Sequence, residues 1–255
     1  MGIIRSFSLV FCITVLFGVL GVQQAFAVSI PGDEDGDGIP TNQEMTIYGT
    51  DPSLQDTDGD GFSDWEEVRN GYSPLVAEKR LKDIDSDGDG LSDALEIAFG
   101  THVLKKDTDN DGYSDGKEVD MGYDPRNGKA SRLEKHIEVS LTKQRLSYYL
   151  GTVRLAEMGI SSGKWDWPTP TGTFKIINKS PKAWSKLAGL WMPYWMGFAG
   201  GRFGIHDLPV WPNGKKEGES HIGKPVSHGC IRVSSAHAKK LYAWTPVGTK
   251  LIIKK

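Results

Sequence analysis

Residues 223–233 read Gly-Lys-Pro-Val-Ser-His-Gly-Cys-Ile-Arg-Val and contain Cys230, one of the chain's two cysteines. A helix is predicted directly after this stretch, with Ser234 or Ser235 as its N-cap and Trp244 near its end, before Pro246. A short strand and a glycine turn that precede a helix expose the side chain at the turn. This stretch therefore predicts an accessible thiol, whose reactivity depends on its neighbours.

Short runs of alternating apolar and polar residues surround this stretch in the second half of the chain. The pattern has a period of two, and turn residues separate the runs. The runs cover 137–141, 145–149, 153–160, 174–177 and 250–253. They predict an antiparallel β-sheet domain with one helix.

Four sequence elements of this half occur in a fixed order. An opening strand ends at Leu141, and Thr169-Pro170-Thr171-Gly172-Thr173-Phe174, Gly204-Ile205-His206 and Ser227-His228-Gly229-Cys230-Ile231-Arg232 follow it. Together they resemble the YkuD-type L,D-transpeptidase catalytic domain over about residues 135–255. The resemblance implies an L,D-transpeptidase-like β-sandwich with one helix after the Cys motif. It also implies a transferase that acts on peptidoglycan peptide stems.

Cys230 is the expected nucleophile, and it needs a base because only the thiolate attacks an amide carbonyl. The family pattern implies that His206 is this base and that His228 completes the motif. His228 remains a rival, since residues i and i−2 of a strand share a face.

The resemblance also assigns roles to the residues around the thiol. Backbone N–H groups near Gly229 and Cys230 would form the oxyanion hole, with Ser227 as part of the same motif. Arg232 would bind a substrate carboxylate or brace the loop.

Two features depart from the family pattern. Asp207 follows His206 where Gly or Ser is common, so it either orients His206 or lies in a solvated loop. The segment 208–220 is unusually long and is a candidate lid. We expect His221 to be a surface residue, and Trp191 and Trp195 near Tyr194 to line a substrate groove.

The implied reaction is a two-step acyl transfer. Cys230 attacks a donor stem, D-alanine leaves, and the resulting thioester reacts with an amine of a second stem. Water as the acceptor would make the protein an L,D-carboxypeptidase, and a protein amine would make it a wall-attachment transferase. No cofactor is expected for catalysis.

The first half of the chain repeats a twelve-residue loop four times, at 33–44, 56–67, 85–96 and 107–118. Each loop has Asp at positions one, three and five, Gly at six and Glu at twelve, which is the arrangement of a calcium loop. Position nine is Asp in three loops and Thr41 in the first, so the first site is expected to be weakest. The candidate ligands are Asp33, Asp35, Asp37, Glu44, Asp56, Asp58, Asp60, Asp64, Glu67, Asp85, Asp87, Asp89, Asp93, Glu96, Asp107, Asp109, Asp111, Asp115 and Glu118.

These loops resemble the bacterial thrombospondin type 3 calcium repeat, which implies short helical turns around structural Ca²⁺ with little hydrophobic core. Charge supports this interpretation. Residues 28–130 carry 26 acidic and 9 basic residues, a net charge of −17, whereas residues 131–255 carry 7 and 20, a net charge of +13. Cations would relieve the repulsion in the acidic half.

The first 27 residues are typical of a secretory signal, with Arg5, an apolar run over 9–22 and an Ala25-Phe26-Ala27 cleavage pattern. Cleavage would remove Cys12, leave no internal disulfide, and send the protein to the periplasm, cell wall or extracellular space. The alternative is an uncleaved anchor, although the run is shorter than the ~20 residues of a spanning helix.

We therefore expect a signal peptide (1–27), a calcium-binding repeat region (28–130) and a catalytic domain (131–255), with a hinge over 126–135. Expected partners are peptidoglycan stems, and wall polymers or another protein for the repeats. Neither nucleic acid nor a stable membrane anchor after cleavage is expected. The competing hypothesis from another class is a calcium-dependent wall-binding module without catalysis.

Overall fold

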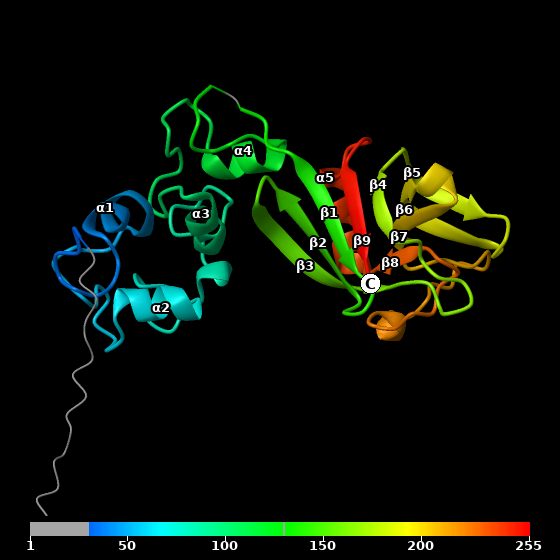
Figure 1. The fold of residues 1–255 in the computed structure, drawn as a ribbon, viewed down its shortest axis with the longest axis horizontal. Coiled ribbons are helices and arrows are strands. Elements are labelled where there is room, and N and C mark those ends of the chain that lie inside the picture. Colours follow the sequence, from blue (N-terminus) through cyan, green and yellow to red (C-terminus); the bar gives the residue numbers. More distant parts are fainter. Residues whose placement is uncertain (1–30, 130) are drawn as a thin grey trace, which may run out of the picture.

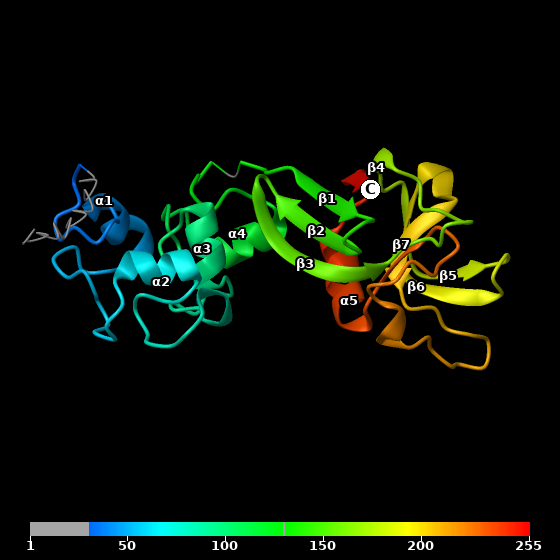
Figure 2. The same ribbon diagram turned by 60° about the horizontal axis from the view of Figure 1, so that its bottom comes forward.

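The computed structural model describes residues 31–129 and 131–255. The molecule is elongated, with the repeats at one end and a β-sheet domain at the other (Figures 1 and 2). The predicted signal peptide and Cys12 lie outside the described residues.

Each calcium loop leads into a short helix that begins at loop position nine. The helices are α1 (Thr41–Gln43), continued by a π-helical turn (Glu44–Tyr48), α2 (Asp64–Asn70), α3 (Asp93–Phe99) and α4 (Asp115–Met121), with a 3₁₀ turn at Leu81–Asp83. A left-handed glycine follows each of these four helical segments, and glycine adopts this conformation without steric cost. The predicted short helical turns are confirmed.

The repeats associate in two pairs. The Asp37 carboxylate of the first loop accepts a hydrogen bond of 3.1 Å from the N–H of Trp65 in α2. In the same way, Asp89 of the third loop accepts one of 2.6 Å from the N–H of Gly116 in α4. The first repeat thus packs on the second, and the third on the fourth.

In the part of the chain that the structure describes, nine strands form one curled sheet in the order β4-β9-β1-β2-β3-β8-β7-β6-β5. The strands are β1 (Lys135–Ser140), β2 (Arg145–Leu150), β3 (Val153–Ser161), β4 (Gly172–Lys175), β5 (Asn178–Ser185), β6 (Leu190–Phe198), β7 (Phe203–Asp207), β8 (Ile231–Val233) and β9 (Lys250–Lys254). The predicted sandwich is one sheet folded at β3, which pairs with β2 along most of its length and with β8 at Ile160 and Ser161.

The sheet is mixed, which corrects the expectation of purely antiparallel pairing. β7 runs parallel to β8, and β1 runs parallel to β9. Both pairs are joined by long connections, and only these return the chain in the same direction. The helix α5 (Ser235–Trp244) matches its predicted bounds and belongs to the connection between β8 and β9.

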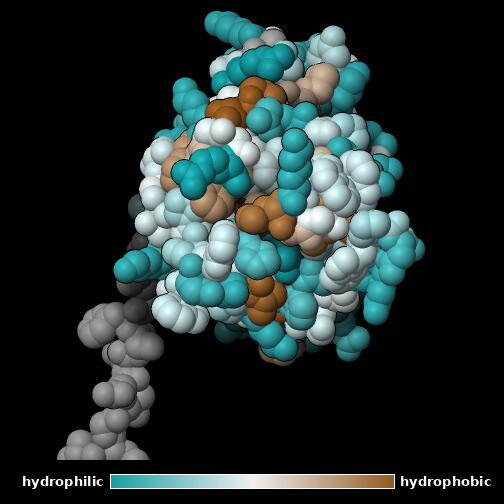
Figure 3. Space-filling view, turned by 90° about the vertical axis from the view of Figure 1, so that its right-hand side faces the viewer, coloured by the Kyte–Doolittle hydropathy of each residue, from teal (hydrophilic) through white to brown (hydrophobic). Residues whose placement is uncertain are grey.

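The main hydrophobic core lies within the sheet domain, where buried residues of β1, β2, β3, β6, β7, β8 and β9 meet α5. The end of the molecule remote from the repeats is largely hydrophilic, with small separate apolar patches (Figure 3). No large exposed apolar surface is evident on that face.

A second buried cluster joins the repeats to the sheet. Leu91, Phe99 and Val119 of the third and fourth repeats pack with Leu150 of β2. Leu133 packs against the same cluster, and its N–H donates to the carbonyl of Gly122 (3.0 Å). At Leu133, the segment predicted to be a hinge is therefore part of a packed interface.

Candidate active site

The parallel pairing of β7 and β8 brings the predicted nucleophile and base to one face of the sheet. His206 is opposite Arg232, and Ile205 is opposite Ile231. Cys230 comes two residues before Arg232, so its side chain lies on the face shared by Arg232 and His206. The neighbouring strands β7 and β8 are seen in Figure 1.

His206 is fixed from two sides and is only 2% exposed. Its Nδ1 lies 2.5 Å from the backbone carbonyl oxygen of Asp207, which accepts a hydrogen bond from Nδ1–H and leaves Nε2 as the basic atom. The ring of Trp195 stacks on the imidazole at a centroid distance of 6.0 Å.

Gly204 makes room for this stacking. A Cβ at this position would lie 2.4 Å from a ring carbon of Trp195. The indole N–H of Trp195 donates to the side chain of Asn178 (2.9 Å), which fixes the ring. Trp195 therefore supports His206 and does not line an open groove, which corrects the expectation for this residue.

Burial favours the neutral form of both reactive groups. It lowers the pKa of His206 to about 4, assisted by the positive charge of Arg232 and opposed by the contacts with Asp207. Burial also raises the pKa of the Cys230 thiol, although the Gly204 N–H and Arg232 act in the opposite direction. At neutral pH both groups are thus uncharged, Cys230 as a thiol and His206 as a neutral imidazole.

The turn before Cys230 is braced by Ser227, which is fully buried. The Ser227 hydroxyl donates to the carbonyl of Cys230 (2.6 Å) and accepts from the N–H of Gly229 (3.1 Å). The Gly229 N–H is therefore engaged within the turn, and of the two N–H groups predicted for the oxyanion hole, only that of Cys230 remains a candidate. Ser227 shapes the turn and holds it.

His228 lies elsewhere, as an exposed residue whose ring meets the edge of Trp167 at a centroid distance of 5.3 Å. His228 is thus exposed, whereas His206 is buried on the sheet face that it shares with Cys230.

The long segment 208–220 is anchored to the site by charge. Glu217 accepts a hydrogen bond of 2.7 Å from Arg232 and also pairs with His221, whose side chain is 46% exposed. Arg232 thus braces this segment, in agreement with one of its two predicted roles. His221 is at the surface, as expected.

Asp207 anchors the other end of the same segment. Its carboxylate accepts from the N–H of Leu208 (2.7 Å), the hydroxyl of Ser235 (2.9 Å) and the ammonium group of Lys216 (2.6 Å). The side chain therefore joins the segment to α5, and only the backbone carbonyl of Asp207 orients His206.

The other predicted groove aromatics also have defined neighbours. Tyr194 packs on Tyr242 of α5, at a centroid distance of 5.6 Å. Trp191 meets Trp184 edge to face at 4.9 Å, and the ammonium group of Lys182 lies 4.6 Å from its ring centroid. Of the three residues, Trp191 and Tyr194 are partly exposed, and Trp195 is buried.

In the repeats, the aspartates at positions one, three and five of each loop converge. In all four loops, one carboxylate oxygen from each of the three residues lies within 4.8 Å of the others. The glycine at position six has a left-handed φ of +96° to +111°, which permits the tight turn between them.

Each loop also contains buried carboxylate oxygens without a hydrogen-bond partner. At position three they belong to Asp35, Asp58, Asp87 and Asp109, and at position twelve to Glu44, Glu67, Glu96 and Glu118. Burial and nearby aspartates raise the pKa of Glu67 to about 8 and that of Glu96 to about 9. Such an unpartnered oxygen cage suits a hard divalent cation.

The aspartates at position nine do not join these clusters. The carboxylate of Asp64 accepts from both the N–H (2.8 Å) and the hydroxyl (2.7 Å) of Thr57 at position two. Asp93 and Asp115 make the same pair of bonds with Ser86 and Thr108. Asp64, Asp93 and Asp115 therefore brace their loops through the residue at position two.

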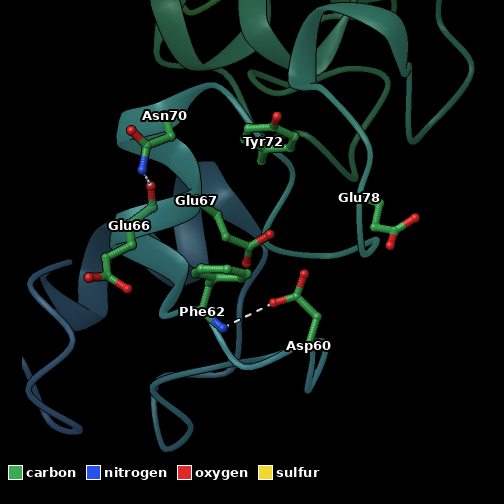
Figure 4. A pocket seen from close by; sticks show the side chains of 7 residues that line it. All are labelled: Asp60, Phe62, Glu66, Glu67, Asn70, Tyr72 and Glu78. Atoms are coloured by element: carbon green, nitrogen blue, oxygen red, sulfur yellow. Dashed lines mark hydrogen bonds between the residues drawn. The ribbon is translucent and has the colours of Figure 1, made fainter.

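A surface hollow of about 450 Å³ opens beside the second loop. Figure 4 shows Asp60 and Glu67 turned toward the same space, with the ring of Phe62 beside them. Of these two carboxylates, that of Asp60 is exposed to solvent and that of Glu67 is buried.

Sequence reasoning missed Glu217, Gly204 and Asn178 as contributors to the site. Glu217 lies in a loop without a recognisable pattern, and the roles of Gly204 and Asn178 depend on where Trp195 packs. Only the position of Gly204 in the Gly-Ile-His element offered a signal.

No helix within the described ranges is both long and apolar enough to cross a membrane. Residues 134–253 match the model of the L,D-transpeptidase catalytic domain, YkuD. The bacterial TSP3 repeat matches residues 33–54, 56–71, 85–101 and 107–127. The predicted resemblance is confirmed for both parts.

Two proteins of Bacillus subtilis (strain 168), which bear the names L,D-transpeptidase YkuD and YciB, are 31% and 32% identical to this chain. The matches cover 46% and 47% of this chain and 65% and 66% of the relatives, so the chain spans less than two thirds of their length.

Among solved structures, an L,D-transpeptidase from Mycobacterium smegmatis is 22% identical, with a TM-score of 0.43 over 49% of this chain and 60% of that one. One from Stackebrandtia nassauensis is 28% identical, with a TM-score of 0.42 over 48% and 56%. By sequence, residues 134–253 resemble the YkuD-type L,D-transpeptidase catalytic domain, and segments that resemble the bacterial TSP3 repeat precede them in the same chain.

Proposed function

We propose that this protein is an exported L,D-transpeptidase that cross-links peptidoglycan peptide stems through a thioester on Cys230. The observation that carries the proposal is the register of β7 and β8. This register supports the proposal, because it puts Cys230 and the buried His206 on one face of the sheet, and the contact of Nδ1 with the Asp207 carbonyl leaves Nε2 as the basic atom.

In the proposed first step, Nε2 of His206 takes the thiol proton as Sγ of Cys230 attacks the stem carbonyl. The Cys230 N–H stabilises the oxyanion. When the tetrahedral intermediate collapses, the bond to D-alanine breaks, and His206 returns the proton to the leaving amine. An amine of a second stem then attacks the thioester, and the thiol is regenerated.

We also propose that positions one, three, five and twelve of each loop hold a structural Ca²⁺. The unpartnered oxygens at positions three and twelve support this assignment. Bound calcium would supply positive charge that offsets the acidic cluster, and it would contribute to the folding of the repeats. The loops supply no group to the Cys230 site.

The test is intact-protein mass spectrometry of the mature protein with a carbapenem and then with a tetrapeptide stem. We expect a covalent adduct in the wild type and none in Cys230→Ala, because the thiol is the acylated group. With the stem, a dimer indicates transpeptidation and a hydrolysed product indicates carboxypeptidation.

The wall-binding hypothesis predicts a different outcome. If folded, calcium-loaded wild type formed neither adduct nor product, the enzymatic proposal would be wrong. Product formation by Cys230→Ala would contradict the role of this cysteine. Mass analysis of the exported protein also tests cleavage after Ala27.

A further inference from the structure

Thr169 is a buried polar residue outside the pair formed by Cys230 and His206. It lies between β3 and β4 and is only 4% exposed. A buried hydroxyl group is normally fully hydrogen-bonded, so its partners indicate what it holds in place.

The Thr169 hydroxyl bridges two backbone segments. It accepts a hydrogen bond of 2.9 Å from the N–H of Gly163 and donates one of 2.9 Å to the carbonyl of Gly229. The hydroxyl thus acts as both donor and acceptor, and its single proton is used in the bond to Gly229. Among aliphatic side chains, only Ser and Thr provide this combination at this length.

The two segments are closely packed, so the bridge has little freedom. A Cβ on Gly163 would lie 2.8 Å from Cα of Gly229, and a Cβ on Gly229 would lie 2.4 Å from the ring of Phe203. A bridge across Gly163 and Ser227 further ties the same segments together.

The carbonyl that Thr169 holds belongs to the peptide unit that ends in the Cys230 N–H. No cis peptide bond occurs among the described residues, so the carbonyl and N–H of this unit point in opposite directions. When the Gly229 carbonyl is held against Thr169, the Cys230 N–H is aimed away from Thr169. Rotation of this unit would turn the N–H with it.

We propose that Thr169 is a positioning residue, whose hydroxyl holds the Gly229–Cys230 peptide so that the Cys230 N–H faces the oxyanion during acyl transfer. The inference rests on the proposed function, in which Cys230 is the nucleophile. Ser227, which belongs to the turn, donates to the Cys230 carbonyl, whereas Thr169, which lies outside the turn, donates to the Gly229 carbonyl.

The test compares Thr169→Val, which keeps the shape and loses both hydrogen bonds, with Thr169→Ser, which keeps the hydroxyl. Thr171→Val is the matched control, because Thr171 is an exposed threonine of the same motif. Each variant is assayed for its acylation rate with a carbapenem and for its rate of Cys230 alkylation by iodoacetamide. Alkylation forms no oxyanion, so it reports the thiol alone.

We expect Thr169→Val to slow acylation by about 10- to 100-fold while alkylation changes by less than about threefold, since one oriented donor is affected. Thr169→Ser and Thr171→Val should acylate at rates near that of the wild type. Thermal unfolding of each variant shows whether it is folded at the assay temperature. If Thr169→Val does not fold, Thr169→Ala takes its place, because it leaves room for water.

Wild-type acylation in Thr169→Val would overturn the inference. An equal loss of acylation and alkylation would also overturn it, because it would indicate general damage to the loop. These results leave the proposed function intact as long as wild-type Cys230 is acylated, whereas stem turnover by Cys230→Ala would contradict the proposed function itself.

Discussion

Burial shifts the pKa values of Cys230 and His206 in opposite directions. It raises the pKa of the thiol and lowers that of the imidazole to about 4, so both groups are neutral in the resting site. A proton must therefore move as the sulfur attacks, which makes the position of His206 Nε2 decisive. The stacking of Trp195 and the carbonyl of Asp207 fix that position.

The pH dependence of acylation should reflect the buried histidine. Above its lowered pKa, His206 is neutral and available as a base, so we expect the carbapenem acylation rate to fall only below about pH 4 to 5. The measurement is the acylation rate from pH 3.5 to 9. An acid limb near 6.5, the ordinary imidazole value, would instead indicate a solvent-exposed histidine as the base.

Gly204→Ala should disrupt the site by steric means. The new Cβ would meet Trp195 at 2.4 Å, so the indole must move and release His206. We expect a loss of acylation of at least about tenfold, the scale of one misplaced catalytic group. Gly218→Ala is the control, because its Cβ would meet nothing closer than 3.8 Å. Equal activity of both variants would refute the role assigned to Trp195.

Among the secondary-structure elements, the hairpin of β2 and β3 has two roles. One face contributes to the core of the sheet domain, and its tip joins the cluster of Leu91, Phe99 and Val119. Phe99 of α3 and Val119 of α4 are the buried large apolar side chains of these two helices, and both belong to this cluster. The third and fourth repeats thus share a core with the catalytic domain.

Phe99→Ala should destabilise the interface. Phe99 is 5% exposed, and removal of a buried phenylalanine ring typically costs about 3 to 5 kcal/mol. We expect a lower denaturant midpoint, measured by tryptophan fluorescence. Seven of the eight tryptophans lie in residues 131–255, so this signal reports mainly the sheet domain. Leu54→Ala, at a residue that is 48% exposed, should change little; a similar loss in both would argue against a specific contact.

Across the whole molecule, the two pairs of repeats have different surroundings. The third and fourth repeats contact the sheet domain, whereas the first and second contact the third and fourth through backbone bonds such as Val103 N–H to the Ile47 carbonyl. We call the third and fourth repeats the inner pair and the first and second the outer pair. Calcium bound to the inner pair should therefore influence the catalytic domain more than calcium bound to the outer pair.

Glu96→Gln and Glu44→Gln test this difference. Both replace a buried carboxylate at position twelve with an isosteric amide, one in the inner pair and one in the outer pair. We expect Glu96→Gln to lower the calcium-dependent gain in thermal stability of the sheet domain, and Glu44→Gln to leave it nearly unchanged. Calorimetry with calcium and with EGTA provides the measurement. Equal effects would show that the repeats act as one unit.

Local patterns in the sequence were sufficient for the calcium loops, the five strands with alternating residues, the helix α5 and the motif around Cys230. In each of these, neighbouring residues determine the structure: the Asp and Gly spacing of a loop, the period of a strand, or the N-cap and the proline that bound a helix. The bounds of α5 and the left-handed glycines at position six agree with those expectations.

Only the tertiary structure showed which distant residues meet. β5 to β8 carry no simple alternation, and the parallel pairing of β7 with β8 depends on a long connection. The same holds for Trp195 beneath His206, Glu217 against Arg232, Thr169 against Gly229, and Phe99 near Leu150. These contacts join residues far apart in the chain, so they depend on packing between elements, which the local sequence does not encode.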